Sequence, residues 1–142
     1  MKIQSHTFGA VEVKEDMVLR FPDGIIGFEE LKRYVILEVE EYGPFRILLS
    51  LDDPEVGFPL IDPALFFPDY TPNIPPSDLK RLSLPSMDEG RIFCIVTLRK
   101  PEESSTVNLR GPIVIHPETR IARQTILTQA AYPVDQPIIN KQ

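Results

Sequence analysis

The sequence has little of several things that would restrict its function, beginning with cysteine. Cys94 is the single cysteine among 142 residues, so the chain can form no internal disulfide bond. It lies in the apolar run IFCIV, which is typical of a buried and unreactive thiol. A lone cysteine also weakly favours a reducing compartment.

Long hydrophobic runs are missing as well. The first ten residues, MKIQSHTFGA, contain no apolar stretch of the kind found in a signal peptide. No run approaches the roughly 20 apolar residues that a membrane helix needs. The sequence therefore predicts a soluble, cytoplasmic protein with no membrane partner.

Positive charge is in short supply. The chain has 15 Lys and Arg against 21 Asp and Glu, a formal net charge of −6. Contacts with phosphate groups need clustered Lys and Arg, so this composition disfavours direct binding of nucleic acid. It is compatible with a basic protein partner, and equally with a charge that only keeps a small domain soluble.

The usual signatures of catalytic and metal sites are also lacking. The two histidines, His6 and His116, lie far apart and have no Cys or His neighbours, which is typical of surface or structural histidines. Gly24 and Gly27 in PDGIIG are typical of turns rather than of a phosphate-binding loop. No serine stands in a Gly-x-Ser-x-Gly motif. We therefore expect no catalytic residue, no cofactor and no metal.

Proline and alternating apolar residues are abundant instead. The 15 prolines are roughly twice the average usage of about 5%, and proline is excluded from helix interiors and central strands. Many short elements are the consequence. Alternation or apolar runs predict strands at 11–15, 17–21, 34–40, 45–51, 56–61, 91–99, 106–111, 112–116 and 120–127.

Some of these strands carry further expectations. The segments 34–40 and 45–51 flank the turn EYGP and predict an antiparallel hairpin. Pro59 predicts that 56–61 lies at an edge or a bulge. The segment 91–99 is the most apolar and is expected at the centre of the sheet, while 120–127 also fits a short helix.

Helix signals are few. The segment 77–84 fits a short helix with Ser77 or Asp78 as its N-cap, and 28–34 fits a single turn. The sequence thus predicts one all-β domain over residues 1–142, a barrel-like or sandwich fold of short antiparallel strands with at most one or two short helices. Residues 133–142 are expected to form an irregular tail.

Three segments resemble a known family. FPDGIIGFE (21–29), LLSLDDPEVGFPLIDPALFFPDY (48–70) and VNLRGPIVIHPETRIARQTIL (107–127) are similar to the signature blocks of the FliW family of flagellar assembly factors. Their order and spacing and the chain length all agree, so the resemblance covers nearly the whole chain. Two positions depart from it, because Gly111 and His116 stand where the family more often has Ala and Asn.

The resemblance implies a function without chemistry. FliW proteins are bacterial, cytoplasmic and not enzymes. They bind CsrA, a small RNA-binding translational repressor, and relieve its repression of flagellin messages. They also bind flagellin, which competes for them and so couples filament export to flagellin synthesis. The family fold is compact and β-barrel-like.

The segment SLDDPEVGFPLIDPALFFPDY (50–70) is the candidate for partner binding. Phe66, Phe67 and Tyr70 would form an aromatic anchor that Pro63 and Pro68 hold in place. The acidic side chains would form a rim facing a basic protein, and they are Asp52, Asp53, Asp62 and Asp69. Asn108 is a further candidate contact.

Structural roles stand beside these functional ones. Adjacent phenylalanines in an irregular segment can plug an open barrel end, and in an extended chain one ring would point inward and the other outward. Asn108 before Gly-Pro is typical of a turn or bulge. The alternative functions are a small β-barrel enzyme or ligand binder using the Asp-rich loops, and a nucleic-acid-binding barrel. The neighbours Asp52 and Asp53 would point apart, which is poor geometry for a catalytic pair.

Overall fold

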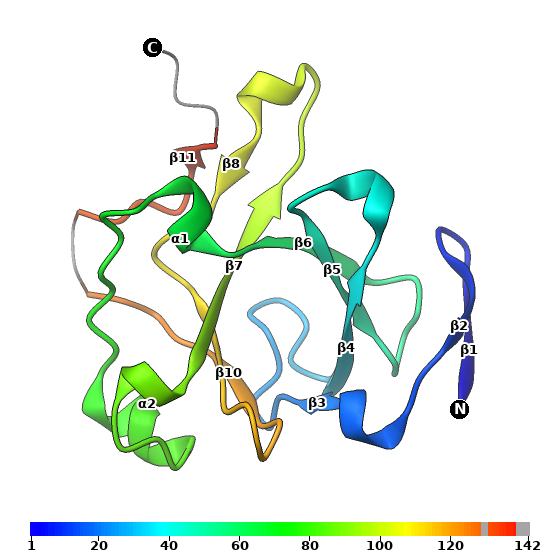
Figure 1. Ribbon diagram of the computed structural model, residues 1–142, viewed down its shortest axis with the longest axis horizontal. Helices are drawn as coiled ribbons and strands as arrows, with labels where there is room; N and C mark the ends of the chain where they lie inside the picture. Colours follow the sequence, from blue (N-terminus) through cyan, green and yellow to red (C-terminus); the bar gives the residue numbers. More distant parts are fainter. Residues whose placement is uncertain (129–130, 139–142) are drawn as a thin grey trace.

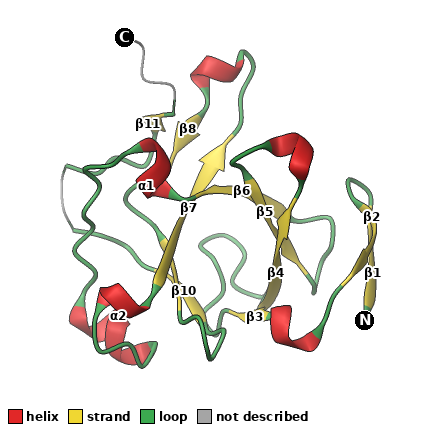
Figure 2. Cartoon of the chain, viewed as in Figure 1, coloured by secondary structure: helices red, strands yellow, loops and turns green. Residues whose placement is uncertain are grey.

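The computed structural model describes residues 1–128 and 131–138, and these form the all-β fold that the sequence predicts. Two α-helices, α1 (Pro63–Phe66) and α2 (Pro76–Arg81), and four single-turn 3-10 helices interrupt the strands of this region. Figure 2 shows that both α-helices lie outside the ring of strands. The strands are β1 (Lys2–Ser5), β2 (Gly9–Glu12), β3 (Leu19–Arg20), β4 (Arg33–Glu38), β5 (Arg46–Ser50), β6 (Gly57–Ile61), β7 (Arg91–Thr97), β8 (Thr106–Val107), β9 (Ile113–Ile115), β10 (Ala122–Gln124) and β11 (Gln136–Pro137).

The main sheet closes into a barrel. Its strands follow the antiparallel order β10, β9, β7, β6, β5, β4, β3. The N–H of Arg20 in β3 donates to the carbonyl of Arg120 at 3.0 Å, and Arg20 forms a parallel bridge with Ile121 beside β10. Figure 1 shows the ring that results, with the loop between β3 and β4 inside it. The barrel-like alternative is therefore the observed one.

Alternation along β7 separates the inside of the barrel from its outer layer. Phe93 is 1% exposed and packs in the interior cluster, to which the β3–β4 loop contributes Phe21 and Ile25. Cys94 and Val96 face the other side, where they pack in a second cluster with the segment that carries α1. The apolar strand 91–99 is central, as predicted, because β7 pairs with β6, β8 and β9.

The N-terminal hairpin stands apart from the barrel sheet. Within the described part of the chain, β1 and β2 pair only with each other, from Lys2 opposite Glu12 to Ser5 opposite Gly9. The hairpin attaches through apolar side chains instead, since Ile3 and Val11 pack on a cluster that contains Val35 and Leu49 of the barrel. The strand predicted at 11–15 is present only in part, because β2 ends at Glu12 and a 3-10 helix begins at Glu15. β1 is an addition to the predicted set.

The hairpin predicted for 34–40 and 45–51 is present as β4 and β5. The placement of 56–61 at an edge or bulge was wrong for the strand as a whole, since β6 pairs with β5 and β7. Pro59 nevertheless lies in the part of β6 that is paired with a neighbouring strand on one side only. It stands opposite Ile47 of β5, whereas β7 pairs only with Leu60 and Ile61. The missing N–H is therefore compatible with a strand inside the sheet.

The helix predicted in 77–84 is present as α2, but its N-cap differs. The helix begins at Pro76 with Pro75 at the N-cap and no side-chain cap. Ser77 and Asp78 lie inside its first turn. Proline at the first helical position needs no N–H partner, so the helix starts two residues earlier than an N-cap at Ser77 indicates.

The structure corrects two other local predictions and, for the strand predicted at 120–127, decides against the alternative helix. Residues 28–31 form turns, and β4 begins at Arg33, so there is no helical turn over 28–34. The segment 120–127 forms β10 rather than a helix. Within the predicted irregular tail, β11 pairs with β8, while residues 139–142 lie outside the described part of the chain. No helix of the described residues is long and apolar enough to cross a bilayer.

Candidate functional site

The second part of the candidate segment 50–70, residues 62–70, begins with a short helix that the sequence analysis missed. Asp62 caps α1, because its Oδ1 accepts a hydrogen bond from the N–H of Ala64 at 3.0 Å. Pro63 occupies the first helical turn, and the N–H of Phe67 closes that turn on the Pro63 carbonyl at 2.7 Å. An Asp followed by Pro is a start signal for a helix. That signal was available in DPALFF.

The helical turn changes where the aromatic rings point. Phe66 and Phe67 are both partly buried against the cluster around Cys94, and the Phe66 ring lies 6.1 Å from that of Phe45. The expectation of one ring inward and one outward was therefore wrong. The exposed apolar side chain of α1 is Leu65, which is 69% exposed.

Tyr70 joins this segment to the third signature block. Its hydroxyl donates to the carbonyl of Leu109 at 2.7 Å, and its ring packs edge-on against Tyr132 at 4.7 Å. Burial, together with the nearby Cys94 thiol, raises the pKa of the Tyr70 hydroxyl well above its usual value. Tyr70 thus fixes 62–70 against the loop that contains Asn108.

Asn108 has the structural role that its sequence context indicates. Its Oδ1 accepts hydrogen bonds from the N–H groups of Arg110 at 3.1 Å and Gly111 at 2.9 Å. A Cβ at Gly111 would lie only 3.0 Å from Asn108 Nδ2 and 3.1 Å from Gln124 Nε2. Glycine therefore leaves room for both amides, and an alanine here would require them to shift.

The acidic candidates do not form one surface. β5 and β6 pair antiparallel, so the turn that holds Asp52 and Asp53 lies at one end of the pair and Asp62 at the other. Asp53 and Asp69 are exposed, while Asp62 is half-buried at its cap position. The structure brings together Asp62, Phe66, Phe67, Asp69 and Tyr70 near the Asn108 loop, and it separates Asp52 and Asp53 from them.

Asp52 is occupied inside the molecule. Its Oδ2 accepts from the backbone N–H groups of Lys32 at 2.8 Å and Arg33 at 3.0 Å, and Oδ1 lies 2.9 Å from Arg33 Nε. Burial acts to raise its pKa, but these bonds and the Arg33 charge outweigh burial and hold the pKa below its usual value. Asp53 instead accepts from Glu55 N at 3.2 Å. The two carboxylates therefore bind different segments of the chain.

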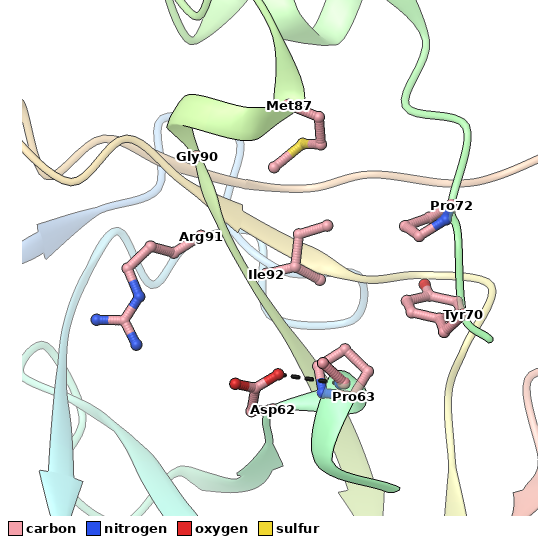
Figure 3. A pocket seen from close by; sticks show the side chains of 9 residues that line it. Asp62, Pro63, Tyr70, Pro72, Met87, Gly90, Arg91 and Ile92 are labelled. Atoms are coloured by element: carbon pink, nitrogen blue, oxygen red, sulfur yellow. Dashed lines mark hydrogen bonds between the residues drawn. The ribbon is translucent and has the colours of Figure 1, made fainter. Parts of the chain in front are cut away.

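Two clefts flank α1. The first, which we call the Met87 cleft, has a volume of about 320 Å³, and Figure 3 shows Ile92 extending from β7 toward Met87 and Tyr70, with Arg91 on the opposite side of the strand. Its lining also includes Asp62, Pro63, Ala64, Pro72 and Gly90. The second, the Leu65 cleft, has a volume of about 350 Å³. It is lined by Glu38, Val39, Glu40, Gly43, Pro44, Phe45, Arg46 and Leu65.

α1 and the two clefts together form what we call the α1 surface. It offers a large exposed apolar side chain, Leu65, between two depressions. The Leu65 cleft adds the acidic side chains of Glu38 and Glu40. Glu38 is 74% exposed at its side chain. An apolar centre with a polar rim is the usual arrangement of a protein-binding surface. The sequence analysis did not name Leu65, Glu38 or Glu40.

Comparison with known proteins identifies relatives over the whole chain. A family model described as FliW protein matches residues 2–138. The flagellar assembly factor FliW of Natranaerobius thermophilus is 39% identical over 143 residues, covering 100% of this chain and 95% of the relative. That of Thermotoga neapolitana is 42% identical over 132 residues, covering 92% of this chain and 88% of the relative.

A solved structure agrees with these relatives. The crystal structure of a flagellar assembly factor FliW superposes with a TM-score of 0.92 at 34% sequence identity, covering 100% of this chain and 99% of the other. The similarity therefore extends over sequence and fold together.

Proposed function

The chain belongs to the FliW family of flagellar assembly factors, and on that premise we propose that it is a cytoplasmic, non-enzymatic regulator that binds CsrA and relieves repression of flagellin synthesis. The observation that carries the proposal is the match to this family over nearly the full chain. Flagellin is the second proposed partner and competes with CsrA for the protein.

The α1 surface supports the proposal on physical grounds. A repressor that binds RNA must carry positive charge for its phosphate contacts. The Leu65 cleft presents Glu38 and Glu40 beside an exposed apolar side chain, which complements a basic and partly apolar surface. Leu65 is then the proposed anchor, while Phe66 and Phe67 pack α1 against the buried cluster that contains Cys94.

The test of the anchor is a measurement of CsrA binding by surface plasmon resonance. Leu65→Ala is expected to speed dissociation roughly 30-fold, equivalent to the loss of about 2 kcal/mol at an interface hot spot, without lowering the melting temperature. Ile26→Ala is the matched control, because Ile26 is 62% exposed but lies in the β3–β4 loop. Equal dissociation rates for the two variants would place the CsrA contact elsewhere.

The test of the rim compares two charge reversals of equal size. Glu40→Lys lies at the Leu65 cleft, and Asp53→Lys lies at the β5–β6 turn. Rim charges act mainly on association, so Glu40→Lys is expected to slow association several-fold and to weaken its salt dependence. If Asp53→Lys slowed association more than Glu40→Lys, the basic partner would instead contact the β5–β6 turn. Asp52→Lys is unsuitable because it would remove three internal contacts.

Competition is tested in the same instrument. CsrA is immobilised and the protein is injected with increasing concentrations of flagellin. We expect flagellin to reduce the binding signal on immobilised CsrA in proportion to the amount of the protein that flagellin has bound. An unchanged CsrA signal in the presence of flagellin that demonstrably binds the protein would contradict competition.

A further inference from the structure

Two arginines from different strands converge on one buried ring. The Cζ of Arg46 in β5 lies 5.2 Å from the centroid of the Phe93 ring, and that of Arg91 in β7 lies 5.1 Å from it. The distance between the two guanidinium Cζ atoms is therefore at most the sum of these two distances. Phe93 is 1% exposed inside the barrel, and β6 separates the two strands. We call these two side chains the arginine pair.

The pair is poorly neutralised. Arg46 has one ion pair, with Glu38 at 3.5 Å, and the Glu38 side chain is 74% exposed, so solvent screens the interaction. Within the described part of the chain, Arg91 forms no ion pair with a carboxylate. Asp62 lines the same cleft as Arg91, but its Oδ1 caps α1. Within the described residues, only one of these two cations therefore has an ion-pair partner, and that acid is exposed, although the protein carries a net charge of −6.

The stacking leaves the hydrogen-bonding edges of the guanidinium groups available. A guanidinium over an aromatic ring presents its face to the ring, while its N–H donors lie in the plane of the group. Such a planar fork binds a carboxylate through two parallel hydrogen bonds. Arg91 is exposed, and the Arg46 side chain is 30% exposed, so both edges are accessible from solvent.

We propose that the arginine pair is a recognition site for an acidic side chain of a partner protein. A protein carboxylate fits better than a polyanion, because Glu38, Glu40 and Asp62 line the same clefts and repel a dense array of negative charge. Arg91 lines the Met87 cleft and Arg46 lines the Leu65 cleft. An acidic side chain of a partner can therefore approach Arg46 from the Leu65 cleft or Arg91 from the border of the Met87 cleft.

This inference goes beyond the proposed function, because the proposed CsrA contact depends on basic groups of the partner and this site depends on acidic ones. The pair also selects among partners. A surface that presents only basic groups at this position would meet two cations and be repelled, so the acidic requirement adds specificity to the apolar contact.

The test uses a blocked pentapeptide with a central glutamate between leucines, followed by nuclear magnetic resonance of the arginine Nε–Hε groups. The glutamate peptide is expected to shift the Arg46 and Arg91 signals at a concentration at least tenfold lower than the same peptide with glutamine. Equal effects of the two peptides would overturn the proposal. Inorganic phosphate is the third probe, and binding as tight as that of the glutamate peptide would show a general anion site and overturn the assignment to a protein carboxylate.

Variants locate the site. Arg46→Gln and Arg91→Gln are each expected to weaken binding of the glutamate peptide at least tenfold. Arg20→Gln is the control, because it removes the same charge from a surface pair with Glu15. Arg91→Lys keeps the charge and the long stem, so it reports on the site even if a glutamine variant misfolds. The proposal would be overturned if Arg91→Lys and every glutamine variant that folds bound the glutamate peptide with wild-type affinity. Weaker binding of the peptide by Arg91→Lys would support recognition by the planar guanidinium group. CsrA binding is measured separately, so failure of one proposal does not decide the other.

Discussion

The carboxylate of Asp52 fixes the start of β4 to the end of β5. It accepts two backbone N–H groups and the Arg33 side chain, and its side chain is 25% exposed. We expect Asp52→Asn to lower the free energy of unfolding by about 1–2 kcal/mol at neutral pH, because hydrogen bonds to a charged acceptor weaken. Urea unfolding of both proteins measures this, and Asp53→Asn is the control.

The same carboxylate predicts a direction for pH dependence. The pKa of Asp52 is lowered in the folded state from its ordinary value of 3.8, so folding disfavours protonation. The stabilisation is therefore complete above the unfolded-state pKa and is lost as pH falls through the lower, folded-state pKa. The gap between wild type and Asp52→Asn should narrow between neutral pH and about pH 3. A constant gap would show that charge contributes nothing.

Cys94 is predicted to be unreactive in the folded protein. It is 0% exposed, and burial raises the pKa of its thiol to about 12, an effect that the Tyr70 hydroxyl opposes and the Asp62 charge reinforces. Labelling by an alkylating reagent at pH 8 should therefore proceed only as fast as the protein opens. Rapid labelling without denaturant, at the rate seen for the denatured chain, would contradict the burial.

Residue roles were predictable where the local sequence determines them. The burial of Cys94 follows from the apolar run around it, and the turn at Asn108 follows from the Gly-Pro that it precedes. Leu65 was not predictable in the same way. Its exposure depends on one helical turn that rotates its neighbours Phe66 and Phe67 onto the core.

At the scale of elements, α1 depends on its cap. Asp62→Ala removes the bond to the Ala64 N–H and is expected to cost about 1 kcal/mol of unfolding free energy. Asp69→Ala is the control, since Asp69 is exposed and follows the helix. If α1 holds Leu65 in place for CsrA, Asp62→Ala should also weaken CsrA binding. Normal binding with a lower melting temperature would separate the helix from the contact.

α2 is fixed to the barrel by an arginine from β10. Arg123 Nε donates to Asp78 Oδ1 at 3.1 Å, and Arg123 also contacts Asp23 in the β3–β4 loop. The Asp78 side chain is 12% exposed, so this pair is largely removed from solvent. We expect Arg123→Ala to cost about 2 kcal/mol, against under about 1 kcal/mol for Arg20→Ala at a surface pair. Thermal or urea unfolding compares the two, and similar losses would show that burial adds nothing.

The strands and α2 were largely predicted from the sequence, whereas α1 was missed. Alternation over five or more residues identified the long strands, because a half-buried sheet imposes that period on its side chains. The two-residue strands β3, β8 and β11 are too short to show any period, so only their longer surroundings indicated β3 and β8, and β11 was missed. The prediction from Pro59 was wrong because the exclusion of proline from paired strands applies to each side of a strand separately. At Pro59, β6 is paired with β5 but not with β7.

At the scale of the whole molecule, stability is expected to differ between the barrel and the N-terminal hairpin. β5, β6 and β7 are paired with barrel neighbours on both sides, whereas β1 and β2 pair only with each other. Hydrogen exchange should therefore be at least about tenfold faster for the β1–β2 amides than for those of β5 to β7. Uniform protection would show that the hairpin unfolds only with the barrel.

The three signature blocks indicated the family from sequence, but the layout of the site required three dimensions. The spacing of Asp52 and Asp62 in one segment predicted a common rim, and the β5–β6 pairing places them at opposite ends. The arginine pair could not be predicted from the sequence either, because Arg46 and Arg91 lie far apart in the chain and come together at the ring of Phe93.

The closure of the barrel between β3 and β10 also limits how a partner can attach. An open sheet edge invites strand addition, in which backbone groups supply most of the affinity and almost any extended chain can join. Here the contact from Arg20 to Arg120 joins the two end strands of the barrel to one another. Recognition where β3 meets β10 must then rely on side chains, which can be exchanged one at a time while the scaffold persists. The same architecture can thus acquire, sharpen or lose a binding partner through surface substitutions alone.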